Sequence, residues 1–302
     1  MAHLDNPLLI HVAAETENRG RVVLAARSGA PHRIAISAAV AVAQAFDAWL
    51  ECLIIEDPHV FALTEHGFAR EVTHAGRIMP LSLTVHAENR TAETANARRV
   101  LQAATAGGSV RVETTVVRQA LLEALASACA ARGPWNIIGL AEPVQAGDGR
   151  WLHHLLSNVS GATGVVLVGP RAASGGGPVT VVVEDVERLP QMLRAAQRLA
   201  ERPDGNGAGR IVLLLAGETA GQIRELEGHV RLVLPEAGAP GRASIEIAAA
   251  GIAHGTPSEA AEALRQSDSG LVIARNGGLV VPPDGDIAAL TLALRCPLLL
   301  VR

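Results

Sequence analysis

Short apolar runs alternate with longer, polar-faced segments along most of the chain. The tail shows this most clearly, because the apolar run at 271–274 is followed by a turn rich in Gly and Pro, an apolar segment of helical spacing at 286–294 and a last apolar run at 296–302. A short run bounded by turn residues is typical of a buried strand, and the longer segment is typical of a helix. The tail is therefore predicted to form a strand, a glycine-containing turn, a helix and a strand.

The same order occurs near the middle of the chain. Residues 135–140 form an apolar run, a loop with Gly147 and Gly149 follows, and then come a helical segment at 151–160 and an apolar run at 164–170. Each occurrence ends roughly one half of the 302 residues. The chain is thus predicted to contain two copies of one fold.

Strands and helices are predicted to alternate about five times in each copy. Strands are expected at 21–26, 50–55, 110–116, 135–140, 164–170, 179–185, 210–215, 244–248, 271–274 and 296–302. Helices are expected at 33–47, 82–106, 119–132, 151–160, 186–202, 219–230, 257–267 and 286–294. Strand–helix–strand units of this length join parallel strands by right-handed crossovers. We predict an α/β fold with two tandem doubly wound, mostly parallel open sheets of the Rossmann-like type.

The predicted domain boundaries follow from the two closing units. They are 1–171 for the first domain, 172–177 for a Gly/Ser-rich linker and 178–302 for the second, shorter domain. The first domain also has an apolar run at 8–12, predicted as an extra edge strand or a loose arm, and an irregular insertion at 57–80. Residues 231–240 have no clear pattern.

Amino-acid composition narrows the kind of core, partner and cellular compartment to be expected. Apolar residues make up 49% of the chain but aromatic residues only 2%, so the core must use small aliphatic side chains, which suit parallel strands covered by helices. The formal net charge of −4, with acids and bases interspersed, argues against nucleic acid as a partner. Without a long apolar run or a leader, we expect a cytoplasmic protein with no membrane insertion. Cys52, Cys129 and Cys296 are expected to be buried, reduced thiols.

Four stretches resemble the universal stress protein family. Residues 22–58 and 180–217 resemble the opening strand, helix and strand of that family. Residues 135–168 and 271–302 resemble its closing strand, glycine loop, helix and strand. The chain as a whole resembles a tandem universal stress protein. The resemblance implies that the two halves imitate the dimer of this family, with the closing strands at 165–168 and 298–301 meeting.

The resemblance also implies where a nucleotide would bind. Family members that bind ATP have a phosphate loop of the form Gly-x2-Gly-x9-Gly-(Ser/Thr/Asn). The first copy keeps Gly147 and, after nine intervening residues, reaches Ser157 and Asn158, but Val144 and Ser157 occupy the outer glycine positions. A β-branched Val resists the backbone geometry that such a loop needs. If ATP or another adenine nucleotide binds in the first domain, the implied lining is Arg27, Ser28, Gly147, Gly149, Ser157 and Asn158.

The second copy departs further from this loop. Ala274 replaces the first glycine, and only seven residues separate Gly277 from Gly285. Pro282 and Pro283 lack backbone N–H donors, and Asp286 would repel a phosphate at the start of the last helix. The second domain is therefore expected to be closed to ATP.

Histidine and serine positions give no pattern for catalysis. His153 and His154 are adjacent, so on a helix they point about 100° apart and cannot bind one zinc ion as a pair. His59, His66 and His74 would share one face of a helix, but an acidic or thiol partner is not evident. The serine-hydrolase elbow Gly-x-Ser-x-Gly is absent from the sequence. We expect no metal site and no catalytic residues.

The insertion at 57–80 has two interpretations. Phe61, Phe68 and Met79 could form a docking surface, or they could cover the sheet edge and fill the core. Insertions after the carboxyl end of a strand often have a function of their own.

Three functions are compatible with the sequence. The leading hypothesis is a non-enzymatic regulatory or interaction protein of universal-stress type, with no cofactor, a protein partner that the sequence does not identify, and a homodimer as a further alternative. The second is a nucleotide-binding sensor that uses the first domain. The third is an enzyme of adenylyl or phosphoryl transfer, and because the chain contains no Lys, Arg27 and Arg150 are the only cations near its glycine loop.

Overall fold

The structure is a computed structural model of the 302-residue chain. It describes residues 20–27, 32–64, 66, 68–72, 76–81, 83–106, 108, 110–131, 135–173, 176–201, 209–237, 243–248, 251–253, 257–266 and 268–302. The predicted edge strand or arm at 8–12, Ser28 and His74 lie outside these residues.

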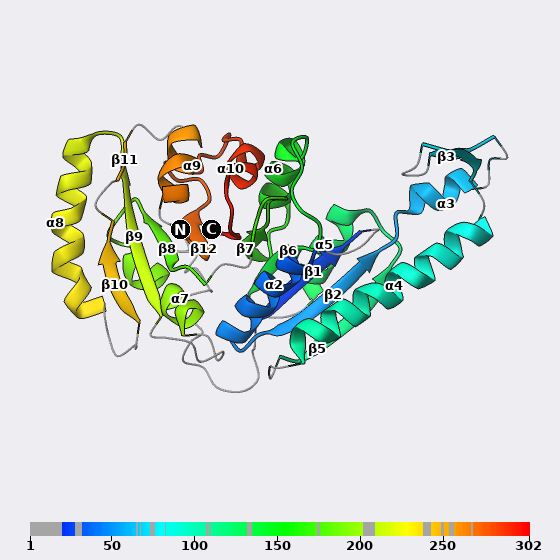
Figure 1. Ribbon diagram of the computed structural model, residues 1–302, viewed down its shortest axis with the longest axis horizontal. Helices are drawn as coiled ribbons and strands as arrows, with labels where there is room; N and C mark the ends of the chain where they lie inside the picture. The colour runs from blue at the N-terminus through cyan, green and yellow to red at the C-terminus, as the bar shows by residue number, and fades with distance from the viewer. Residues whose placement is uncertain are drawn as a thin grey trace.

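One mostly parallel sheet runs through both halves of the described chain (Figure 1). The first half contributes β1 (Arg21–Ala26), β2 (Trp49–Ile55), β5 (Val112–Val117), β6 (Asn136–Leu140) and β7 (Ala162–Leu167). The second half contributes β8 (Val179–Val183), β9 (Arg210–Gly217), β10 (Ser244–Ile247), β12 (Leu271–Arg275) and β13 (Leu298–Val301), and β11 (Ile252–Ala253) pairs with β9.

The strand order is the same in the two halves. Across the sheet it is β10-β9-β8-β12-β13-β7-β6-β1-β2-β5, so within each half the third, second, first, fourth and fifth strands follow one another. All of these neighbours are parallel except β7 and β13, which pair antiparallel with Leu298 opposite Leu167 and Val301 opposite Gly164. The expected α/β class is confirmed, and the two closing strands do meet, within one continuous sheet. The exact domain boundaries stay a prediction.

Helices cover both faces of the sheet. One face carries α2 (Arg33–Ala45), α4 (Leu83–Thr105), α7 (Leu189–Ala200) and α8 (Ala220–Ala237). The other carries α5 (Leu121–Ala131), α6 (Gly149–Asn158), α9 (Pro257–Gln266) and α10 (Ile287–Ala293). Alternate residues of each strand enter the two cores, as Leu24 and Val23 of β1 do. Both clusters consist mainly of Val, Leu, Ile and Ala, as the composition predicts.

The second half differs from the prediction in one helix. The predicted end near residue 230 is wrong, because α8 continues through the unassigned segment to Ala237. Pro235 lies in its last turn, where the missing N–H removes only one of the final helix bonds. The two-residue strand β11 was not predicted.

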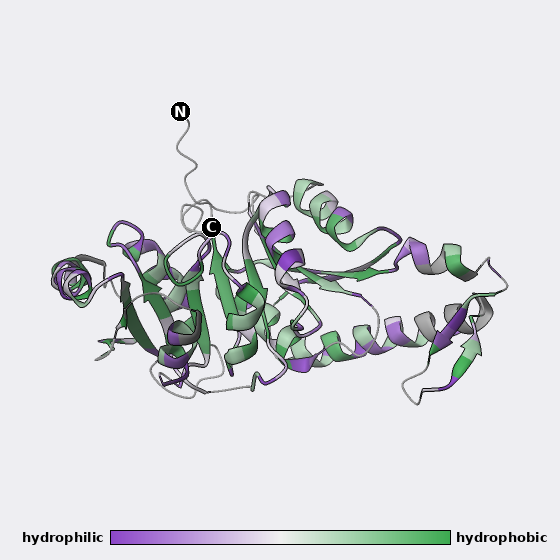
Figure 2. Cartoon of the chain, turned by 90° about the horizontal axis from the view of Figure 1, so that it is seen from above, coloured by the Kyte–Doolittle hydropathy of each residue, from purple (hydrophilic) through white to green (hydrophobic). Residues whose placement is uncertain are grey.

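The insertion forms an arm that projects from one end of the molecule (Figures 1 and 2). It contains α3 (Pro58–Thr64) and the antiparallel pair β3 (Arg70–Val72) and β4 (Ile78–Pro80), which is separate from the main sheet. Phe68 is 77% exposed and Ile78 is 70% exposed, while Met79 is 43% exposed. Phe68 and Met79 therefore do not fill the core. The side chain of Phe61 lies outside the described part of the structure.

Candidate functional site

Strand order reverses twice in this sheet, once between β1 and β6 and once between β8 and β12. Open α/β sheets bind their ligands outside the carboxyl ends of the strands at such reversals. We call them the first and the second switch point. The loops that follow these four strands are the places to look for a nucleotide site.

A carboxylate occupies the first switch point. Glu142, just after β6, accepts a 2.7 Å hydrogen bond from the backbone N–H of Arg27, just after β1. The Nε of Arg27 lies 3.7 Å from the other carboxylate oxygen. Burial raises the pKa of Glu142, while the hydrogen bond and positive charge of Arg27 act in the opposite direction. The guanidinium of Arg27 also lies over the ring of Trp151, at 5.8 Å.

In the loop after β6, backbone N–H groups already donate to acceptors within the protein. The N–H of Val144 donates to the carbonyl of Val168 over 2.8 Å, and the N–H of Gln145 donates to the Asp148 carboxylate over 2.7 Å. Gly147 has an ordinary φ, and an added Cβ would meet nothing within 4 Å. A phosphate loop needs free N–H groups and glycines that permit positive φ or close approach. The N–H groups of Val144 and Gln145 are not free, and Gly147 has neither a positive φ nor a close neighbour.

A carboxylate also occupies the second switch point. Glu184, just after β8, accepts a 2.9 Å hydrogen bond from the N–H of Val280 in the loop after β12. This loop passes so close that a Cβ on Gly278 would overlap the Glu184 carboxylate. Asp185 accepts from the N–H of Arg188 over 2.9 Å and lies 3.4 Å from Nη1 of Arg275.

The rest of the second loop is closed on itself. Gly277 adopts φ +78° and donates its N–H to the carbonyl of Val281 over 2.8 Å. Asp286 caps α10 by accepting from the N–H of Ala289 over 2.9 Å. This loop is therefore a compact turn, which contains the prolines and the helix-capping acid noted in the sequence.

The six residues implied by the resemblance do not form one cluster. Arg27, Gly147 and Gly149 lie near the start of α6, and a Cβ on Gly149 would be 3.2 Å from the Asp286 carboxylate. Ser157 and Asn158 lie at the other end of this ten-residue helix, about 12–14 Å from Gly149 along its axis. Ser28 lies outside the described residues.

The cysteines and histidines show no arrangement for chemistry. All three thiols are buried, which confirms the expected burial, and none is bridged in the structure. Burial is the main cause that raises the pKa of Cys52 and Cys296 to about 12 and that of Cys129 to about 11. Because α3 ends at Thr64, the proposed histidine stripe does not share one helix. Among the described residues, no group of three or more His, Cys, Asp or Glu side chains could hold a metal ion.

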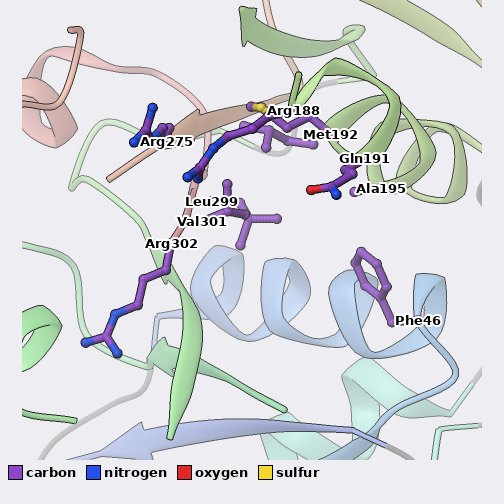
Figure 3. Close-up of a pocket in the computed structure, with 10 residues that line it drawn as sticks. Phe46, Arg188, Gln191, Met192, Ala195, Arg275, Leu299, Val301 and Arg302 are labelled. Atoms are coloured by element: carbon purple, nitrogen blue, oxygen red, sulfur yellow. The ribbon is translucent and has the colours of Figure 1, made fainter. Parts of the chain in front are cut away.

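A separate cleft lies where the two halves join, between α2 and α7 and above β12 and β13 (Figure 3). We call it the seam cleft, and its cavity volume is only about 20 Å³, close to the space of one water molecule. Its lining consists of apolar side chains, three arginines and a glutamine: Phe46, Arg188, Gln191, Met192, Ala195, Ile273, Arg275, Leu299, Val301 and Arg302. Partial burial lowers the pKa of Arg302.

Solved structures with the same architecture include universal stress proteins and a transporter domain. A universal stress protein from Archaeoglobus fulgidus aligns over 93% of this chain and 96% of its own, at a TM-score of 0.53 and 11% identity. A proposed universal stress protein from Pseudomonas aeruginosa aligns over 94% and 93%, at a TM-score of 0.51 and 16% identity. The fold is that of universal stress proteins.

The cytoplasmic domain of a prokaryotic cation chloride cotransporter has the same fold, with a TM-score of 0.54, 12% identity and coverage of 93% and 95%. No family model and no curated protein matches the sequence. Within the described part of this chain, no helix is both long and apolar enough to cross a membrane.

Sequence reasoning did not predict that glutamate carboxylates close the two switch points. Glu142 lies two residues after the predicted strand at 135–140, and Glu184 lies near the end of the predicted strand at 179–185, so their position at the carboxyl edge of the sheet could have been read from the sequence. Their hydrogen-bond partners could not, because Arg27 is 115 residues from Glu142 and Val280 is 96 residues from Glu184.

Proposed function

We propose that this chain is a non-enzymatic regulatory protein of universal-stress type, in which both ancestral nucleotide loops are closed. The observation that carries the proposal is the same at both switch points. A glutamate carboxylate accepts a hydrogen bond from the backbone of the opposing loop, through Arg27 in the first half and Val280 in the second. Each carboxylate places a negative charge where a phosphate group would have to bind.

The backbone N–H groups of the two loops also support the proposal that both nucleotide loops are closed. The N–H groups of Val144, Gln145 and Gly277 all donate to acceptors within the chain. A phosphate would have to break these bonds and displace the nearby carboxylate, so its binding free energy would be reduced by both costs.

The common strand order of the halves supports a tandem origin. Each half has the order of an open sheet with one reversal, and β7 and β13 join them edge to edge in antiparallel fashion. The junction covers an edge strand of each half, as pairing between two separate subunits would. The regulatory role is further supported by the shared fold with a cytoplasmic domain of a transporter.

A nucleotide sensor is the second candidate, and one observation favours it. Arg27 is 44% exposed at the carboxyl end of β1, over the ring of Trp151, where it could contact a phosphate. This function would require Glu142 to move away from the backbone of Arg27.

Thermal unfolding with ATP, ADP, AMP and cyclic AMP separates the two candidates. A nucleotide at 100 times its dissociation constant would add about 2.7 kcal/mol to the free energy of unfolding, which is readily measured. We expect no shift at millimolar concentrations. A shift that Arg27→Ala abolishes would replace the proposed function by the sensor. Arg111→Ala is the matched control, because Arg111 also lies over a tryptophan, Trp49, at 4.3 Å.

A further inference from the structure

A groove between α2 and α4 has the space that the seam cleft lacks. Its cavity volume is about 370 Å³, which lies within the range of small-molecule sites, roughly 300–1,000 Å³. The two helices cover the same face of the sheet in the first half of the chain (Figure 1). We call this space the α2–α4 groove.

Helical spacing places polar side chains on both walls of the groove. Arg33 and Ser37 are four residues apart on α2, and both line the groove. Asn96 and Arg99 are three residues apart on α4 and line it from the other side. Residues three or four apart share one face of a helix, so each wall presents one guanidinium and one smaller polar group.

The rest of the lining is apolar and small. Val100 and Ala104 are half-buried and pack against the core, so they form the floor, whereas Ala103 is exposed. Side chains of this size leave the groove open. A ligand that fits it has a small body with an apolar surface.

Within the described part of the chain, the two arginines of the groove have no carboxylate partner. Neither the guanidinium of Arg33 nor that of Arg99 makes an ion pair or a hydrogen bond there. The first turn of α2 contains no acidic residue, and Glu93, the nearest acid of α4 along the sequence, does not line the groove. Guanidinium groups form their strong hydrogen bonds with carboxylates and phosphates, so these walls favour an anion.

We propose that the α2–α4 groove binds a small organic dianion, a phosphate monoester or a dicarboxylate on a small apolar body. Its oxygens accept hydrogen bonds from Arg33 on one wall and Arg99 on the other, and its body lies on Val100. Two negative charges match the two guanidinium groups. The proposal goes beyond the function proposed above, because neither switch-point loop takes part.

The position of the groove connects such a ligand with the arm. The helix α4 follows β4 of the arm, and the groove lies along the second half of this helix (Figure 1). An anion that bridges Arg33 and Arg99 therefore ties the helix that carries the arm to α2 and the sheet.

Five probes test the chemistry on the full chain. Phenyl phosphate and phthalate place two negative charges on an aromatic ring, benzoate places one, phenol has none, and inorganic phosphate has the charge without the ring. In titration calorimetry we expect phenyl phosphate or phthalate to bind at least about fivefold more tightly than the other three. The tighter of the two dianions identifies the head group. The proposal is overturned if neither dianion binds, or if one of the other three probes binds as tightly.

Arginine substitutions test the location. Arg33→Met and Arg99→Met each keep an apolar stem and remove one charge, and each should weaken binding of the tighter dianion about fivefold or more. Arg98→Met is the matched control, because Arg98 is exposed, does not line the groove and points about 100° away from Arg99 on the same helix. Equal effects of Arg98→Met and Arg99→Met would place the ligand elsewhere.

A change of shape tests the groove without a change of charge. Ala103→Leu narrows the groove and should weaken binding, while the melting temperature without ligand stays the same, since Ala103 is exposed and leucine is a good helix former. Ala95→Leu makes the same change at an exposed position of α4 that does not line the groove, and should leave binding unchanged. Full binding by the Ala103→Leu protein would overturn the proposed location.

Discussion

The two halves share a strand order but close their switch points from opposite strands. In the first half the carboxylate follows the fourth strand, β6, and bonds back to Arg27 after the first strand. In the second half the carboxylate of Glu184 follows the first strand, β8, and bonds forward to Val280 after the fourth strand, β12. The two carboxylates therefore lie on different strands but reach the opposing loop in the same way, because both strands end at the same point of the sheet.

The halves also differ in how firmly the loop is held. The second loop has the Asp185–Arg275 pair, a glycine at φ +78° and a capped helix behind it. The first loop has turn hydrogen bonds and the half-exposed Arg27. Matched substitutions should therefore cost more stability in the second half than in the first.

The largest effect is expected at the two glutamates. Glu184→Ala leaves the N–H of the buried Val280 without its acceptor and should lower the free energy of unfolding by about 1–3 kcal/mol. Glu142→Ala frees the N–H of Arg27, which water can reach, and should cost less than about 1 kcal/mol. Urea unfolding of both variants measures the difference. Equal costs would mean that the two loops are equally enclosed.

A smaller contrast is expected at two glycines. Gly277→Ala forces a Cβ into the left-handed region and should cost about 1 kcal/mol. Gly147 has an ordinary φ and open space where a Cβ would lie. Gly147→Ala should therefore leave the free energy of unfolding unchanged or raise it by about 0.5 kcal/mol, because alanine restricts the unfolded chain. Urea unfolding of the two glycine variants measures this contrast. A clear loss from Gly147→Ala would show that the first loop needs its glycine after all.

The sequence pattern predicts the fold better than the site. The repeated strand–helix order gives the parallel sheet and both closing units, because hydrophobic periodicity is local along the chain. The meeting of β7 with β13 was implied only by the resemblance to universal stress proteins. The end of α8 was mispredicted, because Pro235 and the glycines after it resemble a loop. The closure of the first loop depends on Arg27 and Glu142, which are 115 residues apart, and no local pattern records that bond.

A pH-dependent effect is expected in the first half. Burial raises the pKa of Glu142 above its ordinary value of 4.5, so the folded chain keeps this proton to a higher pH than the unfolded chain. The contribution of Glu142 to stability is therefore largest below that value and falls as pH rises through the raised pKa. The slope must stay below the limit of about 1.4 kcal/mol per pH unit set by one proton.

Glu142→Gln removes this titration. Urea unfolding of the wild type and of Glu142→Gln from pH 4 to pH 7 should show the wild type losing stability relative to the variant as pH rises. A difference that stays constant or grows in favour of the wild type would mean that the ion pair with Arg27 outweighs burial, and that the first switch point is held more tightly than the structure indicates.

The smallest effect is expected in the arm, which the second half lacks. Phe68→Ser and Ile78→Thr change side chains that are 77% and 70% exposed, so each should alter the free energy of unfolding by less than about 0.5 kcal/mol. Leu101→Ala, in the body of α4 and 2% exposed, is the control and should cost about 2–5 kcal/mol. A cost of 2 kcal/mol or more for Phe68→Ser would show that the arm packs against the core in solution, and the difference between the halves would then lie in packing as well as in the switch-point loops.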